Sequence, residues 1–146
     1  MKLTTIKDVL GNTYIGLHLM QDNIDMFLKF AHDNIVNFKF LNDNLLKRNN
    51  GNYHVTAFNV AECQKNPLII YLKDIDINDL KMIGIGSISK NDNTTFFIVC
   101  QSVTINKMRL SLGLDFRDLH ITIGFTKKDL FHMGKSNCNI LFFKNL

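Results

Sequence analysis

The sequence lacks the features that mark membrane, secreted and zinc-binding proteins. None of its apolar runs approaches the about 18 residues that a membrane-spanning helix needs. Its three cysteines are odd in number and show no Cys-x-x-Cys spacing, which argues against a disulfide framework and a zinc site. Residues 1–8 are too polar for a signal peptide. We therefore expect a soluble, cytoplasmic protein with no membrane contact.

Signatures of several enzyme classes are missing as well. The chain has no His-Glu-x-x-His sequence and no dense Asp/His cluster that would bind a metal. It has no nucleophile elbow for a serine and no family signature around a cysteine. Gly84-x-Gly86 is not followed by a helix start, which favours a strand over a phosphate-binding loop. The sequence predicts neither a metal nor a cofactor.

What is present fits one folded domain, residues 1–146. The 46% hydrophobic and 21% charged residues are ordinary for a globular chain, and twelve Phe with no Trp predict a core of Phe, Ile and Leu. The net charge of +4 favours anionic partners. Because the lysines are scattered, we expect a small nucleotide or oligonucleotide as partner and no binding to duplex DNA. The oligomeric state stays open.

Local patterns predict a mixture of strands and helices. Alternating or apolar runs predict strands at 13–19, 54–58, 81–88, 95–100, 118–125 and 138–143. Helical spacing predicts a helix from Asp22 to Ile35, with Asp22 or Asn23 as its cap, and another at 103–112 with Ile105, Met108 and Leu112 buried. A short helix or turn at 61–66 stops at Pro67, the only proline, and the apolar run 68–72 fits no single type.

Two short stretches carry the chemistry. Residues 53–58 and 118–125 each hold a His-x-Thr sequence inside an apolar run, His54-Val55-Thr56 and His120-Ile121-Thr122. Residues two apart in a strand point to the same face, so each copy presents an imidazole beside a hydroxyl. A histidine can accept or donate a proton near neutral pH, and a hydroxyl can donate to a phosphate oxygen. The pair predicts acid–base chemistry on a phosphoester.

This paired motif resembles that of the 2H phosphoesterase superfamily. The resemblance implies an α+β, bilobal, RNA ligase-like fold in which two antiparallel sheets face a central groove and the helices lie outside. It also implies that four side chains converge on one phosphate without a metal. Two of them are catalytic, His54 and His120, and two bind phosphate, Thr56 and Thr122.

The resemblance also suggests substrates. Members of the superfamily act on RNA 2′,3′-cyclic phosphates, on 2′-5′ oligoadenylates and on cyclic dinucleotides. The run 118–125 and the short chain look closest to viral and phage members, and Ala57 and Ile123 depart from the leucine that typically follows each motif in bacterial RNA ligase-like members. We expect a metal-independent phosphodiesterase that cleaves a cyclic dinucleotide such as cyclic GMP-AMP, as viral or phage evasion of nucleotide-based immune signalling.

Two alternatives stay open. The first is a phosphodiesterase for RNA 2′,3′-cyclic phosphate or 2′-5′ oligoadenylate, and the second is a nucleotide-binding module without turnover.

Aromatic side chains near the motifs could stack on the bases of the substrate. Such base contacts are predicted at Tyr14, on the strand face opposite Ile15 and Leu17, and at Phe131 and His132 in the polar loop after the second motif.

Overall fold

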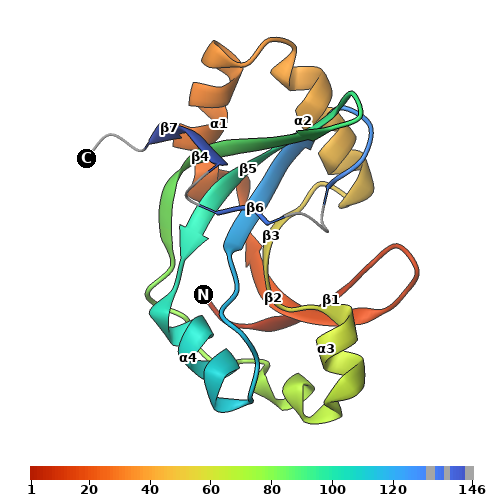
Figure 1. The fold of residues 1–146 in the computed structure, drawn as a ribbon, viewed down its shortest axis with the longest axis vertical. Coiled ribbons are helices and arrows are strands. Elements are labelled where there is room, and N and C mark those ends of the chain that lie inside the picture. Colours follow the sequence, from red (N-terminus) through yellow and green to blue (C-terminus); the bar gives the residue numbers. More distant parts are fainter. Residues whose placement is uncertain (131–133, 137–138, 144–146) are drawn as a thin grey trace.

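Two antiparallel sheets form the frame of the molecule (Figure 1). The structure is a computed structural model that describes residues 1–130, 134–136 and 139–143. The elements follow in the order β1 (Thr4–Lys7), β2 (Thr13–Leu19), α1 (Gln21–Asn34), α2 (Phe38–Arg48), β3 (Tyr53–Phe58), α3 (Val60–Lys65), the 3₁₀ helix η1 (Pro67–Leu72), β4 (Lys81–Lys90), β5 (Asn93–Gln101), α4 (Val103–Ser111), β6 (Leu119–Phe125) and β7 (Ile140–Phe143).

The two sheets meet at the strands that carry the motifs. One sheet has the order β1-β2-β3 and the other β6-β5-β4-β7, so that β3 and β6 are edge strands. These two edges lie against each other (Figure 1). The expected α+β fold with two antiparallel sheets is confirmed.

The helices cover the sheets from outside. α1 packs against β4, α2 against β6 and α3 against β2 (Figure 1). The predicted apolar stripe of α1 is confirmed, with buried side chains at Ile24, Phe27, Leu28 and Ala31. The helix begins one residue earlier than predicted, at Gln21. Asn23 lies in the first turn of the helix and not at its cap. Its Oδ1 accepts a hydrogen bond of 2.8 Å from the N–H of Met20, the N-cap residue.

The hairpin formed by β4 and β5 is also confirmed. Lys90 pairs with Asn93, and the two residues between them, Asn91 and Asp92, have positive φ angles of 50° and 61°. Such a two-residue turn matches the twist of the strands that it joins, and Asn and Asp tolerate this conformation well.

The expected apolar stripe of α4 (Val103–Ser111) needs correction. In α4 the buried side chains are Ile105, Asn106 and Arg109, whereas Leu112 lies beyond the helix and is exposed. A buried arginine is tolerated there because the carboxylate of Glu62 pairs with it.

Three segments had no type assigned from the sequence. The run 68–72 belongs to the 3₁₀ helix η1, and the other two are the strand β1 and the helix α2.

Two kinds of feature are absent from the described residues. No helix there has both the length and the apolar character required to cross a bilayer. No group of three or more His, Cys, Asp or Glu side chains in the same part of the chain could hold a metal ion.

Candidate active site

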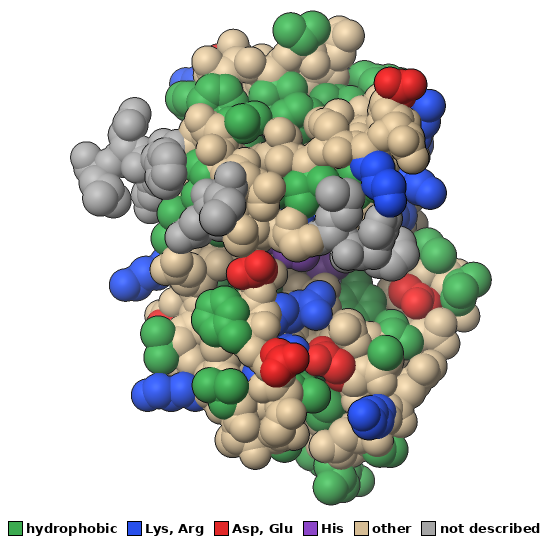
Figure 2. Space-filling view, in the orientation of Figure 1, with side chains coloured by type: hydrophobic (Ala, Val, Ile, Leu, Met, Phe, Trp, Pro, Cys, Tyr) green, Lys and Arg blue, Asp and Glu red, His purple; other side chains and the backbone are tan. Residues whose placement is uncertain are grey.

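The two His-x-Thr motifs lie on neighbouring strand edges. On β3, His54 and Thr56 are half-buried and alternate with the buried Val55 and Ala57. On β6, His120 is half-buried and Thr122 is buried. Histidine side chains lie at the bottom of a recess in the middle of one face of the molecule, beside Lys or Arg side chains (Figure 2). Because β3 and β6 are in contact, the structure brings the two motifs together.

The first motif has a neighbour on β2. The Tyr14 hydroxyl lies 3.3 Å from Nε2 of His54, and the two ring centroids are 5.5 Å apart. Burial raises the pKa of Tyr14 to about 12, so its hydroxyl keeps its proton and can donate to Nε2. That Tyr14 stacks on a base stays a prediction; in the structure its hydroxyl contacts the His54 imidazole.

A glycine permits the close approach of strands β2 and β3. Gly16 pairs with Thr56 where the register of β2 and β3 shifts. A Cβ at Gly16 would collide with the carbonyl oxygen of Val55, so only glycine lets the two strands approach this closely. His18 lies opposite His54 in the same pairing, and its side chain is exposed.

The surroundings keep the histidines of both motifs neutral. Burial, followed by the charge of Arg48, lowers the pKa of His54 to about 4. Burial, followed by the charge of Lys135, lowers the pKa of His120 to about 4. Desolvation and neighbouring cations both disfavour the imidazolium form. In the free protein at neutral pH both imidazoles can therefore accept a proton.

A buried ion cluster lies behind the second motif. Asp129 Oδ2 accepts hydrogen bonds from Thr122 Oγ1 at 3.2 Å and from Arg48 Nη1 at 2.9 Å. Lys135 Nζ lies 3.6 Å from Asp129 Oδ1 and donates to the carbonyl of Leu130 at 2.7 Å. Although burial opposes it, the charges of Lys135 and Arg48 hold the pKa of Asp129 below its ordinary value.

This cluster has a consequence for phosphate binding. While Thr122 donates to Asp129, its hydroxyl hydrogen is not available to a phosphate oxygen. Thr122 could therefore donate to a phosphate oxygen only after its hydroxyl turns away from Asp129. No local pattern predicts Asp129, Arg48 or Lys135 as partners, because they lie far apart along the chain or in the polar loop 126–135.

A second ion pair anchors the first motif. Arg109 is buried, and its Nη1 and Nη2 donate to the two carboxylate oxygens of Glu62 at 2.9 and 2.7 Å. Nη1 also donates to the carbonyl oxygen of Ala57 at 2.8 Å. Since Ala57 directly follows Thr56, α4 fixes the position of the motif on β3.

The predicted base contacts at Phe131 and His132 lie outside the residues that the structure describes. The other five predicted site residues, Tyr14, His54, Thr56, His120 and Thr122, come from β2, β3 and β6.

The motif region is also the region matched by a protein family. The family model for the Swiss Army Knife, 2H phosphoesterase domain matches residues 15–131, which include both His-x-Thr motifs. Comparisons with curated proteins and with solved structures found no match.

Proposed function

The chain belongs to the 2H phosphoesterase family, whose members act on phosphoester bonds, and on this basis we propose that His54, His120, Thr56 and Thr122 form the catalytic site of a metal-independent phosphodiesterase. The observation that carries the proposal is the contact between β3 and β6, the two strands that hold the motifs, together with the histidine side chains at the bottom of the recess in Figure 2. A pair of histidines can supply both the base and the acid that the reaction needs.

The proposed reaction proceeds in line at phosphorus. One histidine takes the proton from the attacking oxygen, which forms a new bond to phosphorus. The bond to the leaving oxygen breaks, and the other histidine gives that oxygen a proton. Thr56 and Thr122 donate to the non-bridging oxygens, where negative charge is concentrated. A bound phosphodiester also raises the pKa of both histidines, so that one of them can hold the proton that the acid step requires.

For the substrate we propose a cyclic dinucleotide such as cyclic GMP-AMP. The resemblance of the second motif to viral and phage members supports this choice, and so does the net positive charge of the chain. The enzyme would then act in the cytoplasm, against the nucleotide signal of a host defence.

A substrate panel tests the activity and the substrate together. We would incubate the purified protein, in the presence of EDTA, with cyclic GMP-AMP, a 2′-5′ oligoadenylate and an RNA ending in a 2′,3′-cyclic phosphate, and separate the products by chromatography. The expected result is turnover of cyclic GMP-AMP without added metal. A variant lacking both histidines, His54→Ala/His120→Ala, controls for contaminating phosphodiesterases.

Each other outcome has a defined meaning. Cleavage of one of the other two substrates alone would replace the substrate assignment and keep the chemistry. Activity that EDTA abolishes and a divalent ion restores would refute the metal-independent mechanism. Binding of cyclic GMP-AMP without any product would show a nucleotide-binding module.

A further inference from the structure

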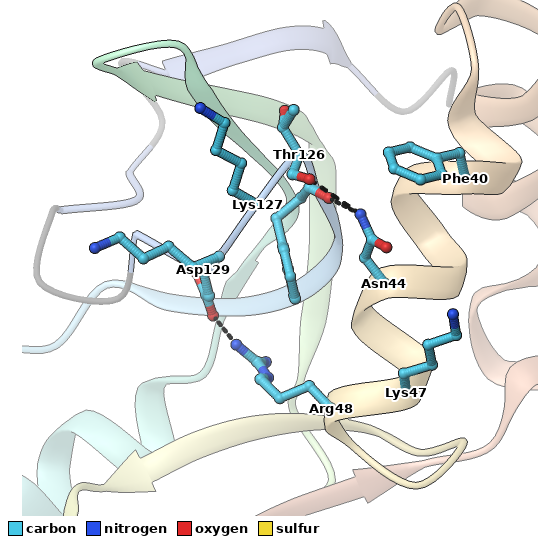
Figure 3. Close-up of a pocket in the computed structure, with 9 residues that line it drawn as sticks. Phe40, Asn44, Lys47, Arg48, Thr126, Lys127 and Asp129 are labelled. Atoms are coloured by element: carbon cyan, nitrogen blue, oxygen red, sulfur yellow. Dashed lines mark hydrogen bonds and ion pairs between the residues drawn. The ribbon is translucent and has the colours of Figure 1, made fainter.

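A second recess adjoins the catalytic site, between α2 and the chain after β6 (Figure 3). Its cavity of about 390 Å³ is lined on one side by α2 and on the other by residues 125–129. Asn44 holds the two sides together, since its Nδ2 donates to the carbonyl oxygens of Phe125 and Thr126 at 2.9 and 3.1 Å. A cavity of this size is within the range of small-molecule sites.

Arg48 connects this recess to the catalytic site. Its guanidinium lines the recess and binds Asp129, which in turn accepts the hydrogen bond from Thr122 (Figure 3). The charge of Arg48 also acts on His54. A ligand that spans both sites would pass over this arginine.

The recess carries an excess of positive charge. Lys47 from α2 and Lys127 from the opposite side line it together with Lys128, and all three are exposed. Within residues 1–130, 134–136 and 139–143, none of these three ammonium groups has an ion-pair or hydrogen-bond partner. The one acid in the lining, Asp129, already pairs with Arg48 and Lys135. The recess is therefore suited to an anion.

An aromatic ring is available at the same place. Phe40 lines the recess, and its side chain is 59% exposed. Phe125, by contrast, is covered by the guanidinium of Arg48, which lies 5.3 Å from the ring centroid. An exposed ring beside unpaired cations is the combination that binds a base and its phosphate.

We propose that this recess, the α2 recess, binds the second nucleotide unit of the substrate. Its phosphate would lie among Lys47, Lys127 and Lys128 and its base on Phe40, while the scissile phosphate lies between the two histidines. The proposal rests on the proposed function and narrows it: the preferred substrate carries at least two phosphates. A mononucleotide 2′,3′-cyclic phosphate would leave the α2 recess empty.

A variant in which glutamine replaces the three lysines of the recess tests the proposal. We would compare the wild type with Lys47→Gln/Lys127→Gln/Lys128→Gln on cyclic GMP-AMP and on 2′,3′-cyclic AMP. For cyclic GMP-AMP we expect KM to rise on the order of tenfold with little change in kcat, since three exposed ion pairs with the bound phosphate are lost together. For 2′,3′-cyclic AMP we expect no change.

A matched variant controls for the overall charge. Lys39→Gln/Lys90→Gln/Lys107→Gln removes the same charge from exposed positions that do not line the recess. It should behave as the wild type on both substrates. The proposal would be overturned if KM for cyclic GMP-AMP rose equally in the two triple variants. It would also be overturned if the recess variant changed KM equally for both substrates.

The result also separates this proposal from the proposed function. If the wild type cleaves neither substrate, the proposed function fails. Calorimetric titration with cyclic GMP-AMP then decides about the recess: weaker binding by the recess variant alone supports it, whereas equal or absent binding overturns it.

Discussion

The Tyr14 hydroxyl lies 3.3 Å from Nε2 of His54, so a side chain of β2 contacts the imidazole of the first motif. Gly16 lies on the same strand opposite Thr56, and a Cβ there would collide with the carbonyl oxygen of Val55, so the pairing of β2 with β3 at this point requires glycine. The contact suggests a second role for Tyr14 beside the predicted stacking on a base. We propose that its hydroxyl orients the imidazole through Nε2.

Removing that hydroxyl tests the role. In Tyr14→Phe the ring stays but the hydrogen bond is lost, and we expect kcat to fall on the order of tenfold because one hydrogen bond contributes about 1 kcal/mol. KM should change little. A stacking role would give the opposite pattern, with normal activity for Tyr14→Phe and a raised KM for Tyr14→Ala, so steady-state kinetics of both variants distinguish the two.

The paired histidines should be individually indispensable. We expect His54→Ala and His120→Ala each to lower kcat by about 10²- to 10⁴-fold, as is typical for the loss of a general acid or base. The double variant should lose little more than the worse single variant, since the two groups act in one step. His18→Ala serves as the matched control, because His18 is exposed opposite His54; near-normal turnover by either catalytic variant would contradict the paired mechanism.

The pH dependence should show where the protons reside. The dependence of kcat/KM reports the free protein, in which the pKa of each histidine is about 4. The form with one neutral and one protonated histidine is then most abundant near pH 4 and becomes rarer as the pH rises. We therefore expect kcat/KM to fall from pH about 4 towards neutrality, and kcat, which reports the complex with an anionic substrate, to have its optimum at higher pH.

Asp129 provides the control for this profile. Its carboxylate raises the pKa of both histidines. Asp129→Asn removes that charge, so the optimum of kcat/KM should move to still lower pH. An optimum near neutrality that Asp129→Asn leaves in place would contradict the assignment.

The Arg109–Glu62 pair should be important for stability. In Glu62→Gln the shape is kept, but the charge of the buried Arg109 is left uncompensated, and we expect the free energy of unfolding to fall by about 3 kcal/mol. Urea denaturation measures this change. The exposed pair Lys39–Asp43 is the control, since Asp43→Asn should cost less than about 1 kcal/mol; equal effects would refute a structural role for the buried pair.

Local periodicity explains what the sequence could predict. Both motif strands were recognisable because His54 and Thr56, like His120 and Thr122, are two residues apart and alternate with apolar neighbours. α2 was missed although Phe38, Leu41 and Leu45 recur at helical spacing and Asn37 is a residue type favoured at the N-cap; no acid in the first turn marks its start.

Polar contacts between distant segments could not be predicted at all. Asn42 looks like a solvated residue, yet its Nδ2 donates to Tyr53 Oη at 2.9 Å and to the carbonyl oxygen of Ile123 at 2.7 Å. The pairs Arg48–Asp129 and Arg109–Glu62 likewise join residues from different elements. Such partners are chosen by the tertiary fold, which no local pattern encodes. The sequence therefore predicted the two motifs, which the structure places on adjoining strands, but not the polar partners that surround them.

The last prediction concerns the nucleophile. Where a ribose hydroxyl neighbours the phosphodiester, one histidine can deprotonate it, its oxygen can attack phosphorus, and the other histidine can protonate the departing 5′ oxygen. An intramolecular attack gains from effective molarity, whereas a water molecule must first be positioned. We therefore expect a cyclic phosphate as the first product, and expect a 2′-deoxy analogue of a 3′-5′ linkage to bind but to resist cleavage. Thr56 and Thr122 still hold its phosphate, so the loss should fall on kcat and leave the dissociation constant nearly unchanged. Matched measurements of binding and turnover decide the point, since equal cleavage of the two substrates would identify water as the nucleophile.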